Sequence, residues 1–206
     1  MRVYLTRHGD RGGTEPHPRV DPSLSPLGRQ QAEALGRRLA ALEAGRAACE
    51  IIASPFRRTS QTAQIVAEVL DCRVRVEPAF CELFHATFTG LKDFRGLEAA
   101  EAAAEFDRLA NPDVLIGRWW PQMPETQQQC DLRVAGAIQQ WVPRLQTDGL
   151  ESALLIGHGA SCQSMMRCLI PGFCEEGQDC CGLSLLRLDD RSGPARLEFH
   201  NDTSHL

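Results

Sequence analysis

VYLTRHG at residues 3–9 and ALLIGHG at residues 153–159 decide the fold, because each is a short apolar run that ends in histidine and glycine. Short apolar runs of this kind are typical of buried strands. Residues 51–53 and 74–76 have the same character, and helical patterns lie between the runs. Strands that alternate with helices predict a three-layer α/β/α fold, in which helices cover both faces of a mostly parallel central sheet.

The helices are predicted from their start signals. Ser25 is a favourable N-cap and Pro26 a favourable first residue for a helix that runs to about residue 42. Ser54-Pro55 indicates the start of a second helix, which ends near Leu70. The other expected elements are helices at about 132–145 and 161–169 and closing strands at about 182–188 and 195–199.

A segment at about 86–128 interrupts the alternation of strands and helices. It contains an Ala/Glu-rich helix near 97–109, followed by a stretch with prolines and tryptophans. We expect it to be a helical insertion that caps the core of a single domain spanning residues 1–206. Its aromatic side chains could stack on a substrate or form the core of the cap, and we favour the core. They are Phe84, Phe88, Phe94, Trp119 and Trp120.

The composition argues against some classes of partner. The chain of 206 residues has a formal net charge of −5, whereas non-specific binding of nucleic acid relies on basic surface. The apolar run before Arg7 is too short for a signal peptide. No run approaches the roughly 20 apolar residues that a membrane-spanning helix needs. We therefore expect a cytoplasmic protein that binds neither nucleic acid nor membrane.

The nine cysteines raise the question of a metal site. Four of them recur every six residues, at Cys162, Cys168, Cys174 and Cys180. Zinc sites usually contain pairs two to four residues apart, and a step of six residues turns a helical side chain by about 240°. We therefore expect reduced cysteines that serve as small apolar filler, and no bound metal.

The two histidines that follow strands are candidates for one site. Ligands of open α/β sheets bind beyond the carboxyl ends of the strands, so we expect His8 and His158 to face a common crevice. Arg7, at the end of an apolar strand, indicates an anionic partner for this crevice. Either histidine alone could equally be a hydrogen-bonded structural residue.

A third strand end adds positive charge. SPFRR at 54–58 begins a helix, and helix N-termini attract anions. An arginine in the first turn can bind a phosphate with two hydrogen bonds. One of Arg57 and Arg58 is expected to be an ordinary surface arginine.

Together, these segments resemble the histidine phosphatase superfamily, the phosphoglycerate-mutase-like proteins. They occur in the family's order and are Arg7-His8-Gly9, SPLGRQQA at 25–32, SPFRRTSQTA at 54–63, Glu82 and GHG at 157–159. The family's second arginine stands four residues after the serine of the SP motif, which selects Arg58 over Arg57.

The resemblance implies a phosphatase that needs no metal or cofactor and attacks small-molecule phosphate monoesters with His8, through a phosphohistidine intermediate. His158 would be a second catalytic histidine and Glu82 the general acid and base. Glu77 is a competing acid that is expected to point away. The resemblance and the Gly-rich strand ends assign phosphate binding to Arg7, Arg58, His158, Gly159 and Arg11.

Two positions depart from the mutase branch of this family. Arg11 stands where mutases usually carry a small hydroxyl residue, and Thr14 stands where they usually carry asparagine. The departures favour a phosphatase, with a phosphoglycerate-mutase-type phosphotransferase or a non-catalytic phosphate-ester-binding module as the alternatives. Arg11 fits a surface loop as well as it fits a substrate contact. The segment 201–205 is similar to the ending of bacterial members, and no chemical role follows for it.

Overall fold

The computed structural model describes residues 1–11, 21–44, 49–87, 94–174, 177–188 and 194–206. Within these residues, the centre of the molecule is a six-stranded sheet with the strand order β3-β2-β4-β1-β5-β6. Thr14 and Phe88 lie outside the described residues.

The strands run mostly parallel. The central strands β1 (Arg2–Arg7) and β4 (Ser152–Gly157) pair in parallel, and β4 is followed on its other side by β2 (Cys49–Ala53) and β3 (Val74–Val76), also parallel. On the other side of β1, β5 (Leu183–Arg187) pairs antiparallel with both β1 and the edge strand β6 (Arg196–Asp202). In the β1–β4 register Arg7 lies opposite Gly157, so these strands end level with each other.

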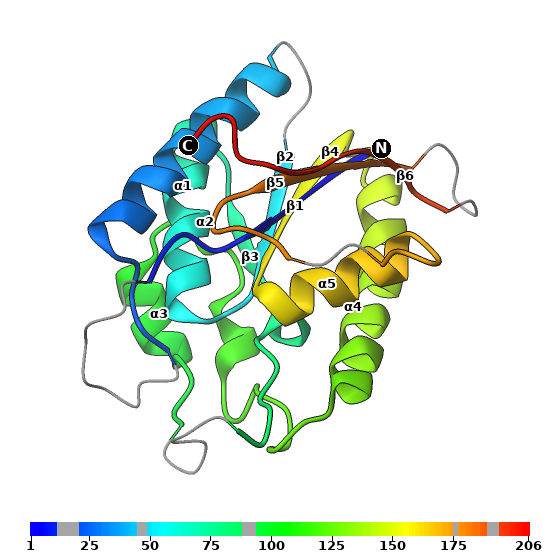
Figure 1. Ribbon diagram of the computed structural model, residues 1–206. Coiled ribbons are helices and arrows are strands. Elements are labelled where there is room, and N and C mark those ends of the chain that lie inside the picture. The colour runs from blue at the N-terminus through cyan, green and yellow to red at the C-terminus, as the bar shows by residue number, and fades with distance from the viewer. Residues whose placement is uncertain (12–20, 45–48, 88–93, 175–176, 189–193) are drawn as a thin grey trace.

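Helices cover both faces of the sheet (Figure 1). On one face α1 (Pro26–Leu42) and α2 (Arg57–Leu70) pack on a core that includes Tyr4, Ile51 and Leu154. On the other face α4 (Gln127–Thr147) and α5 (Gly159–Leu169) pack on a core that includes Val3 and Leu155. The three-layer α/β/α architecture predicted from the sequence is therefore confirmed.

Helix starts follow local capping chemistry. Ser25 accepts a hydrogen bond from the backbone N–H of Gly28, as expected of the N-cap of α1. The fourth helix begins at Gln127, earlier than the predicted residue 132, because Thr126 and Gln129 form a capping box. The second helix begins at Arg57 rather than at Ser54, since Phe56 keeps an extended backbone.

The segment between β3 and α4 contains the short helices η1 (Pro78–Phe80), α3 (Ala99–Glu105) and η3 (Pro112–Leu115). The helix predicted at 97–109 is shorter, because the backbone is extended at Phe106. The aromatic side chains of this segment pack on one another and on Phe56, and they are Phe84, Phe94, Trp119 and Trp120. The described aromatic residues of the segment therefore form a core, as the sequence suggested.

The nine cysteines are all free thiols. Cys162 lies on the buried face of α5, where burial raises the pKa of its thiol, whereas Cys174 is exposed. Residues of the six-residue repeat therefore face different surroundings. In the described residues, no group of three or more His, Cys, Asp or Glu side chains is arranged to hold a metal ion.

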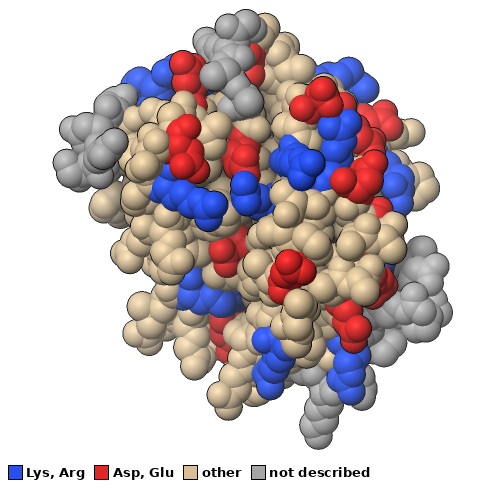
Figure 2. Space-filling view, turned by 180° about the vertical axis from the view of Figure 1, so that it is seen from behind, with Lys and Arg blue, Asp and Glu red and all other residues tan. Residues whose placement is uncertain are grey.

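Basic and acidic side chains are interspersed on the face of the molecule shown in Figure 2. Such mixing produces no extended basic field on this face, which is what non-specific binding of nucleic acid would need. Within the described ranges, no helix has both the length and the apolar character needed to cross a membrane.

Candidate active site

The level ends of β1 and β4 bring His8 and His158 together. The backbone N–H of His8 donates to the carbonyl of Gly157 at 3.1 Å, and the ring centroids of the two histidines lie 5.2 Å apart. Both side chains are almost completely buried. The two histidines that follow the strand ends therefore lie side by side in the structure.

Arg58 joins the two histidines. This side chain is 2% exposed and comes from the first turn of α2. Its Nε donates to Nε2 of His8 at 3.0 Å, and its Nη2 lies 2.9 Å from Nδ1 of His158. A guanidinium has donors and no acceptor. Each of these imidazole nitrogens must therefore present a lone pair to it.

The contact of the other ring nitrogen, Nδ1, determines the tautomer of His8. Nδ1 lies 2.7 Å from the carbonyl oxygen of Gly9, which can only accept, so Nδ1 carries the proton. Burial and the nearby charges of Arg58 and Arg7 hold the pKa of His8 well below its usual range. His8 is therefore neutral near pH 7, with a lone pair on Nε2, which is the form of imidazole that acts as a nucleophile.

His158 is held in the opposite tautomer. Its Nε2 lies 2.8 Å from the hydroxyl oxygen of Ser54, at the end of β2, and donates to it because Nδ1 presents its lone pair to Arg58. Burial and the charge of Arg58 also lower the pKa of His158 well below its usual range. The chain that follows β2 therefore contributes two residues to this site, Ser54 and Arg58.

Arg57 and Arg58 have different surroundings. The guanidinium of Arg57 forms ion pairs with Glu101 and Glu105 of α3 and is partly exposed. These ion pairs connect α2 to α3, whereas Arg58 points toward His8 and His158. The spacing argument that selected Arg58 agrees with this placement.

Arg7 lies beside the two histidines. Its Nη1 donates to the carbonyl of Gln178 at 3.3 Å, and its charge lowers the pKa of both His8 and His158. In the described part of the chain, the buried Nε–H of Arg7 has no hydrogen-bond partner. A buried donor without a partner is costly, so this group is available to an anion bound in the site.

The glycines at the strand ends serve different purposes. A Cβ at Gly9 would lie 2.4 Å from the carbonyl oxygen of Gly28, so Gly9 allows the chain after His8 to lie against the start of α1. A Cβ at Gly159 would meet no atom within 4 Å, so the first residue of α5 borders open space. Gly159 therefore fits the expectation that the backbone is left open to a ligand, whereas Gly9 packs against α1.

Arg11 is exposed, yet its charge contributes to lowering the pKa of His8 and of Arg58. It is therefore near the site, on the loop that follows His8.

Of the two acids considered, Glu82 faces the site and Glu77 does not. Oε2 of Glu82 lies 3.8 Å from Nδ1 of His158 and 3.9 Å from Nη2 of Arg58. Glu77 instead accepts hydrogen bonds from the backbone of Ala79 and from the indole of Trp141. Glu82 is therefore the one of this pair within reach of a group bound between Arg58 and His158.

Asp21 is a second carboxylate beside Arg58, and sequence reasoning missed it. Its Oδ1 lies 3.6 Å from Nη1 of Arg58 and accepts the backbone N–H of Arg57 at 2.7 Å. Burial raises the pKa of Asp21 to about 6, against the opposing effect of Arg58. Residues 10–24 have only the Gly, Pro and Asp content of a loop, and no spacing in them distinguishes Asp21.

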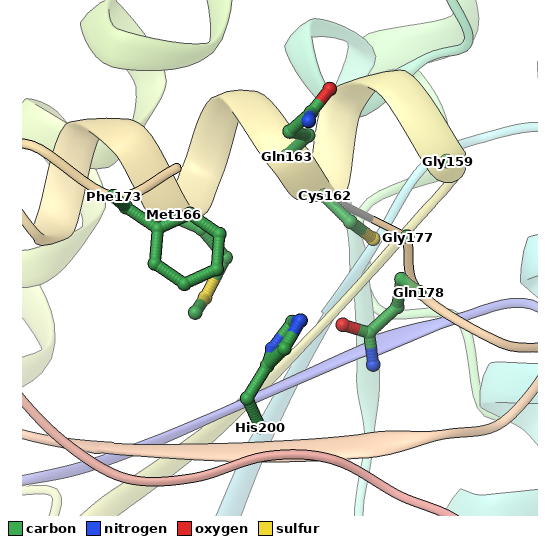
Figure 3. Close-up of a pocket in the computed structure, with 8 residues that line it drawn as sticks. All are labelled: Gly159, Cys162, Gln163, Met166, Phe173, Gly177, Gln178 and His200. Atoms are coloured by element: carbon green, nitrogen blue, oxygen red, sulfur yellow. The ribbon is translucent and has the colours of Figure 1, made fainter. Parts of the chain in front are cut away.

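A small pocket of about 10 Å³ adjoins this site (Figure 3). It lies between α5 and β6, with Gly159, Gln178 and His200 among its lining residues, and has room for about one water molecule. Asn201 holds the lining segment in place, since its Oδ1 accepts the backbone N–H of Asp179. The C-terminal segment thus supports the backbone that contacts Arg7.

Comparison with known proteins relates the whole chain to one family. The model of the histidine phosphatase superfamily (branch 1) matches residues 3–203. A protein of Enterobacter sp. (strain 638), named "Probable phosphoglycerate mutase GpmB", is 27% identical over 100% of this chain and 95% of its own length. A protein of Erwinia tasmaniensis with the same name is 32% identical, over 55% of this chain and 50% of its own length.

Solved structures share the fold. A mycobacterial glucosyl-3-phosphoglycerate phosphatase, Rv2419c, complexed with VO3, has a TM-score of 0.70 at 21% identity and covers 98% of this chain and 99% of its own. YhfR of Bacillus stearothermophilus has a TM-score of 0.67 at 22% identity, over 99% and 98% of the two chains. The protein histidine phosphatase SixA, complexed with tungstate, has a TM-score of 0.64 at 16% identity, over 98% and 97%.

Proposed function

Because the chain belongs to the histidine phosphatase superfamily (branch 1), we propose that it hydrolyses phosphate monoesters without a metal, through a phosphohistidine intermediate on His8. The observation that carries the proposal is the contact of one buried guanidinium, that of Arg58, with both His8 and His158 at 3.0 and 2.9 Å. A phosphoryl group seated there would lie within reach of a nucleophile and several hydrogen-bond donors.

In the first step, Nε2 of His8 attacks the phosphorus and the bond to the ester oxygen breaks. The hydrogen bond from Nδ1 to Gly9 keeps the lone pair on Nε2. Arg58 and Arg7 bind the phosphoryl oxygens, with the free Nε–H of Arg7 supplying one donor. Fixed positive groups in a buried site stabilise the transition state without having to reorganise.

His158 would bind the phosphoryl group in its protonated form. In the structure its Nδ1 accepts from Arg58 and its Nε2 donates to Ser54. A hydrogen bond from Nδ1 to a phosphoryl oxygen needs a proton on this nitrogen. The negative charge of a bound phosphate favours that proton electrostatically.

Glu82 would protonate the leaving oxygen and then take a proton from the water that attacks the phosphohistidine, which releases inorganic phosphate. The distances of 3.8 and 3.9 Å to His158 and Arg58 support this role. Gly159 would offer its backbone to the phosphoryl group. Arg11, at the edge of the site, would contact the remainder of an anionic substrate.

Phosphatase activity is tested with p-nitrophenyl phosphate. We expect hydrolysis that resists EDTA and is lost in His8→Ala, together with acid-labile labelling of the wild-type protein by radioactive substrate. Equal rates in wild type and His8→Ala would reject His8 as the nucleophile. A wild type that binds phosphate without turnover would favour the non-catalytic binding module.

A phosphoglycerate mutase is the second candidate, favoured by the GpmB relative that matches the full length of the chain. Arg11, in place of a small hydroxyl residue, favours the phosphatase. The two activities are separated by supplying 3-phosphoglycerate with a bisphosphate primer. Formation of 2-phosphoglycerate supports the mutase, whereas release of inorganic phosphate as the main product supports the phosphatase.

A further inference from the structure

Arg58 is a fully buried cation, and its charge must be balanced from within the protein. Two carboxylates lie near different terminal nitrogens of its guanidinium. Glu82 is 3.9 Å from Nη2, and Asp21 is 3.6 Å from Nη1. Burial lowers the pKa of Arg58 to about 10, while Asp21 and Glu82 act to raise it. Both carboxylates therefore help to keep Arg58 charged.

The two carboxylates differ in what the proposed reaction requires of them. Glu82 must be protonated when it delivers a proton to the leaving group and ionised when it accepts one from water. Its charge therefore changes during each turnover. Asp21 lies near the other terminal nitrogen, Nη1, and the proposed reaction assigns it no proton transfer.

The position of Asp21 is determined by the same helical turn that carries Arg58. Its Oδ1 accepts the backbone N–H of Arg57 at 2.7 Å, at the N-terminus of α2. A carboxylate is favoured there by the free N–H groups of the first turn. Asp21 and Arg58 are thus held to one rigid element, which fixes the direction of the guanidinium.

We propose that Asp21 is a positioning residue, which holds the Arg58 guanidinium in the orientation that binds the phosphoryl oxygens. The proposal rests on the phosphatase function proposed above. Asp21 acts through Arg58, without touching the substrate, and its contribution requires the ionised carboxylate.

The state of ionisation of Asp21 then links binding to pH. Arg58 and Arg57 face Asp21 from α2 and lower its pKa, whereas Glu101 of α3 and burial raise it, with a result of about 6. Above this pH the ionised Asp21 supports Arg58, and below it the neutral carboxyl resembles asparagine. The contribution of Asp21 to the capture of a tetrahedral dianion should therefore be lost as the pH falls through about 6.

The test is calorimetric binding of sulfate, whose charge does not change between about pH 5 and 8, to wild type and Asp21→Asn. We expect the Kd of the variant to rise about tenfold at neutral pH, which corresponds to about 1.4 kcal/mol. We also expect the difference in Kd between wild type and variant to disappear as the pH falls below about 6, where the Asp21 carboxyl is neutral, whereas protonation of His158 affects both proteins alike. Asp71→Asn is the matched control, because Asp71 lies at the other end of α2, is exposed and pairs with Arg108.

The outcomes distinguish the two proposals. Unchanged sulfate affinity and pH profile in a folded Asp21→Asn would overturn the positioning role. If Asp21→Asn does not fold, Asp21→Ser takes its place, and unchanged sulfate affinity in that variant would overturn the role instead. Sulfate binding needs no turnover, so an Asp21-dependent profile combined with hydrolysis that does not depend on His8 would reject the proposed function and retain the role of Asp21.

Discussion

Nε of Arg58 lies 3.0 Å from Nε2 of His8, so the nitrogen that would attack phosphorus accepts a hydrogen bond from a cation. This contact keeps a lone pair on Nε2, and the positive charge lowers the pKa of the imidazole. In the proposed reaction, a substrate phosphoryl group enters between these two side chains. The guanidinium then changes partner, from the nitrogen to the phosphoryl oxygens.

Arg58→Lys should lower kcat/KM by about 10²- to 10³-fold, which is typical for the loss of a donor that stabilises transition-state charge. A lysine ammonium is a compact point charge and cannot span His8 and His158 in the way that a planar guanidinium does. Steady-state kinetics with p-nitrophenyl phosphate measures the loss. Arg57→Lys is the control, since Arg57 pairs with the exposed side of α3, and its rate should stay within about threefold. Similar losses in both variants would argue against a special role of Arg58.

Glu82→Gln should slow the hydrolysis of alkyl phosphates more than that of aryl phosphates. Alkoxides are poor leaving groups that need a proton, and general acid catalysis contributes about 10²- to 10⁴-fold. The ratio of the two rates, measured in wild type and variant, reports this difference. Glu77→Gln serves as the control, because Glu77 is hydrogen-bonded to Trp141 rather than to the site. A loss of equal size for both kinds of ester would exclude Glu82 as the acid.

The part of the site that depends on strand ends could be predicted from the sequence. His8 and His158 each follow a buried strand, and parallel strands that end level bring such residues together. The choice of Arg58 over Arg57 came from family spacing rather than from physics, because both residues begin the same helix. Their difference arises from α3, whose glutamates bind Arg57, and this contact is not encoded locally.

Contacts between distant segments could not be predicted. Asp21 sits in a stretch of sequence whose composition indicates only the absence of regular structure, and its proximity to Arg58 arises in the tertiary structure, where it lies at the first turn of α2. Asn201 has a backbone φ of 50° and binds Asp179 from the far edge of the sheet. No local sequence pattern indicates that Asp21 contacts Arg58 or that Asn201 contacts Asp179, because these contacts exist only in the tertiary structure.

Stability should fall as the pH drops below about 6.5. Burial and Arg58 depress the pKa of His8 and of His158 in the folded protein, so the unfolded chain binds a proton at each where the folded chain does not. Each histidine then contributes a slope of up to about 1.4 kcal/mol per pH unit. Asp21 acts in the opposite direction between about pH 6 and pH 4, because its raised pKa makes the folded protein bind the extra proton.

Urea denaturation at several pH values between about 5.5 and 7.5 measures this slope. His158→Gln removes one titrating group, so its slope should be smaller than that of wild type by about one proton. A free energy of unfolding that is flat across this range in wild type would contradict the neutral state assigned to both histidines.

Gly28→Ala should destabilise the protein, although alanine favours helices over glycine. A Cβ at Gly28 would lie 2.0 Å from the backbone carbonyl oxygen of Asp10, and a backbone atom cannot move aside as a flexible side chain can. Overpacking of this kind costs about 1–3 kcal/mol. The displaced backbone, at Asp10, lies two residues after His8, so kcat should fall as well.

Gly136→Ala, in the middle of α4, is the matched control for Gly28→Ala. A Cβ there meets nothing within 4 Å, so the helix propensity of alanine should stabilise the protein by about 0.5–1 kcal/mol, with kcat unchanged. Thermal and urea unfolding of the two variants should therefore shift in opposite directions. Equal stabilisation by both substitutions would mean that the chain after His8 does not pack tightly against the first turn of α1. The close contact of Gly9 with Gly28 would then not position His8.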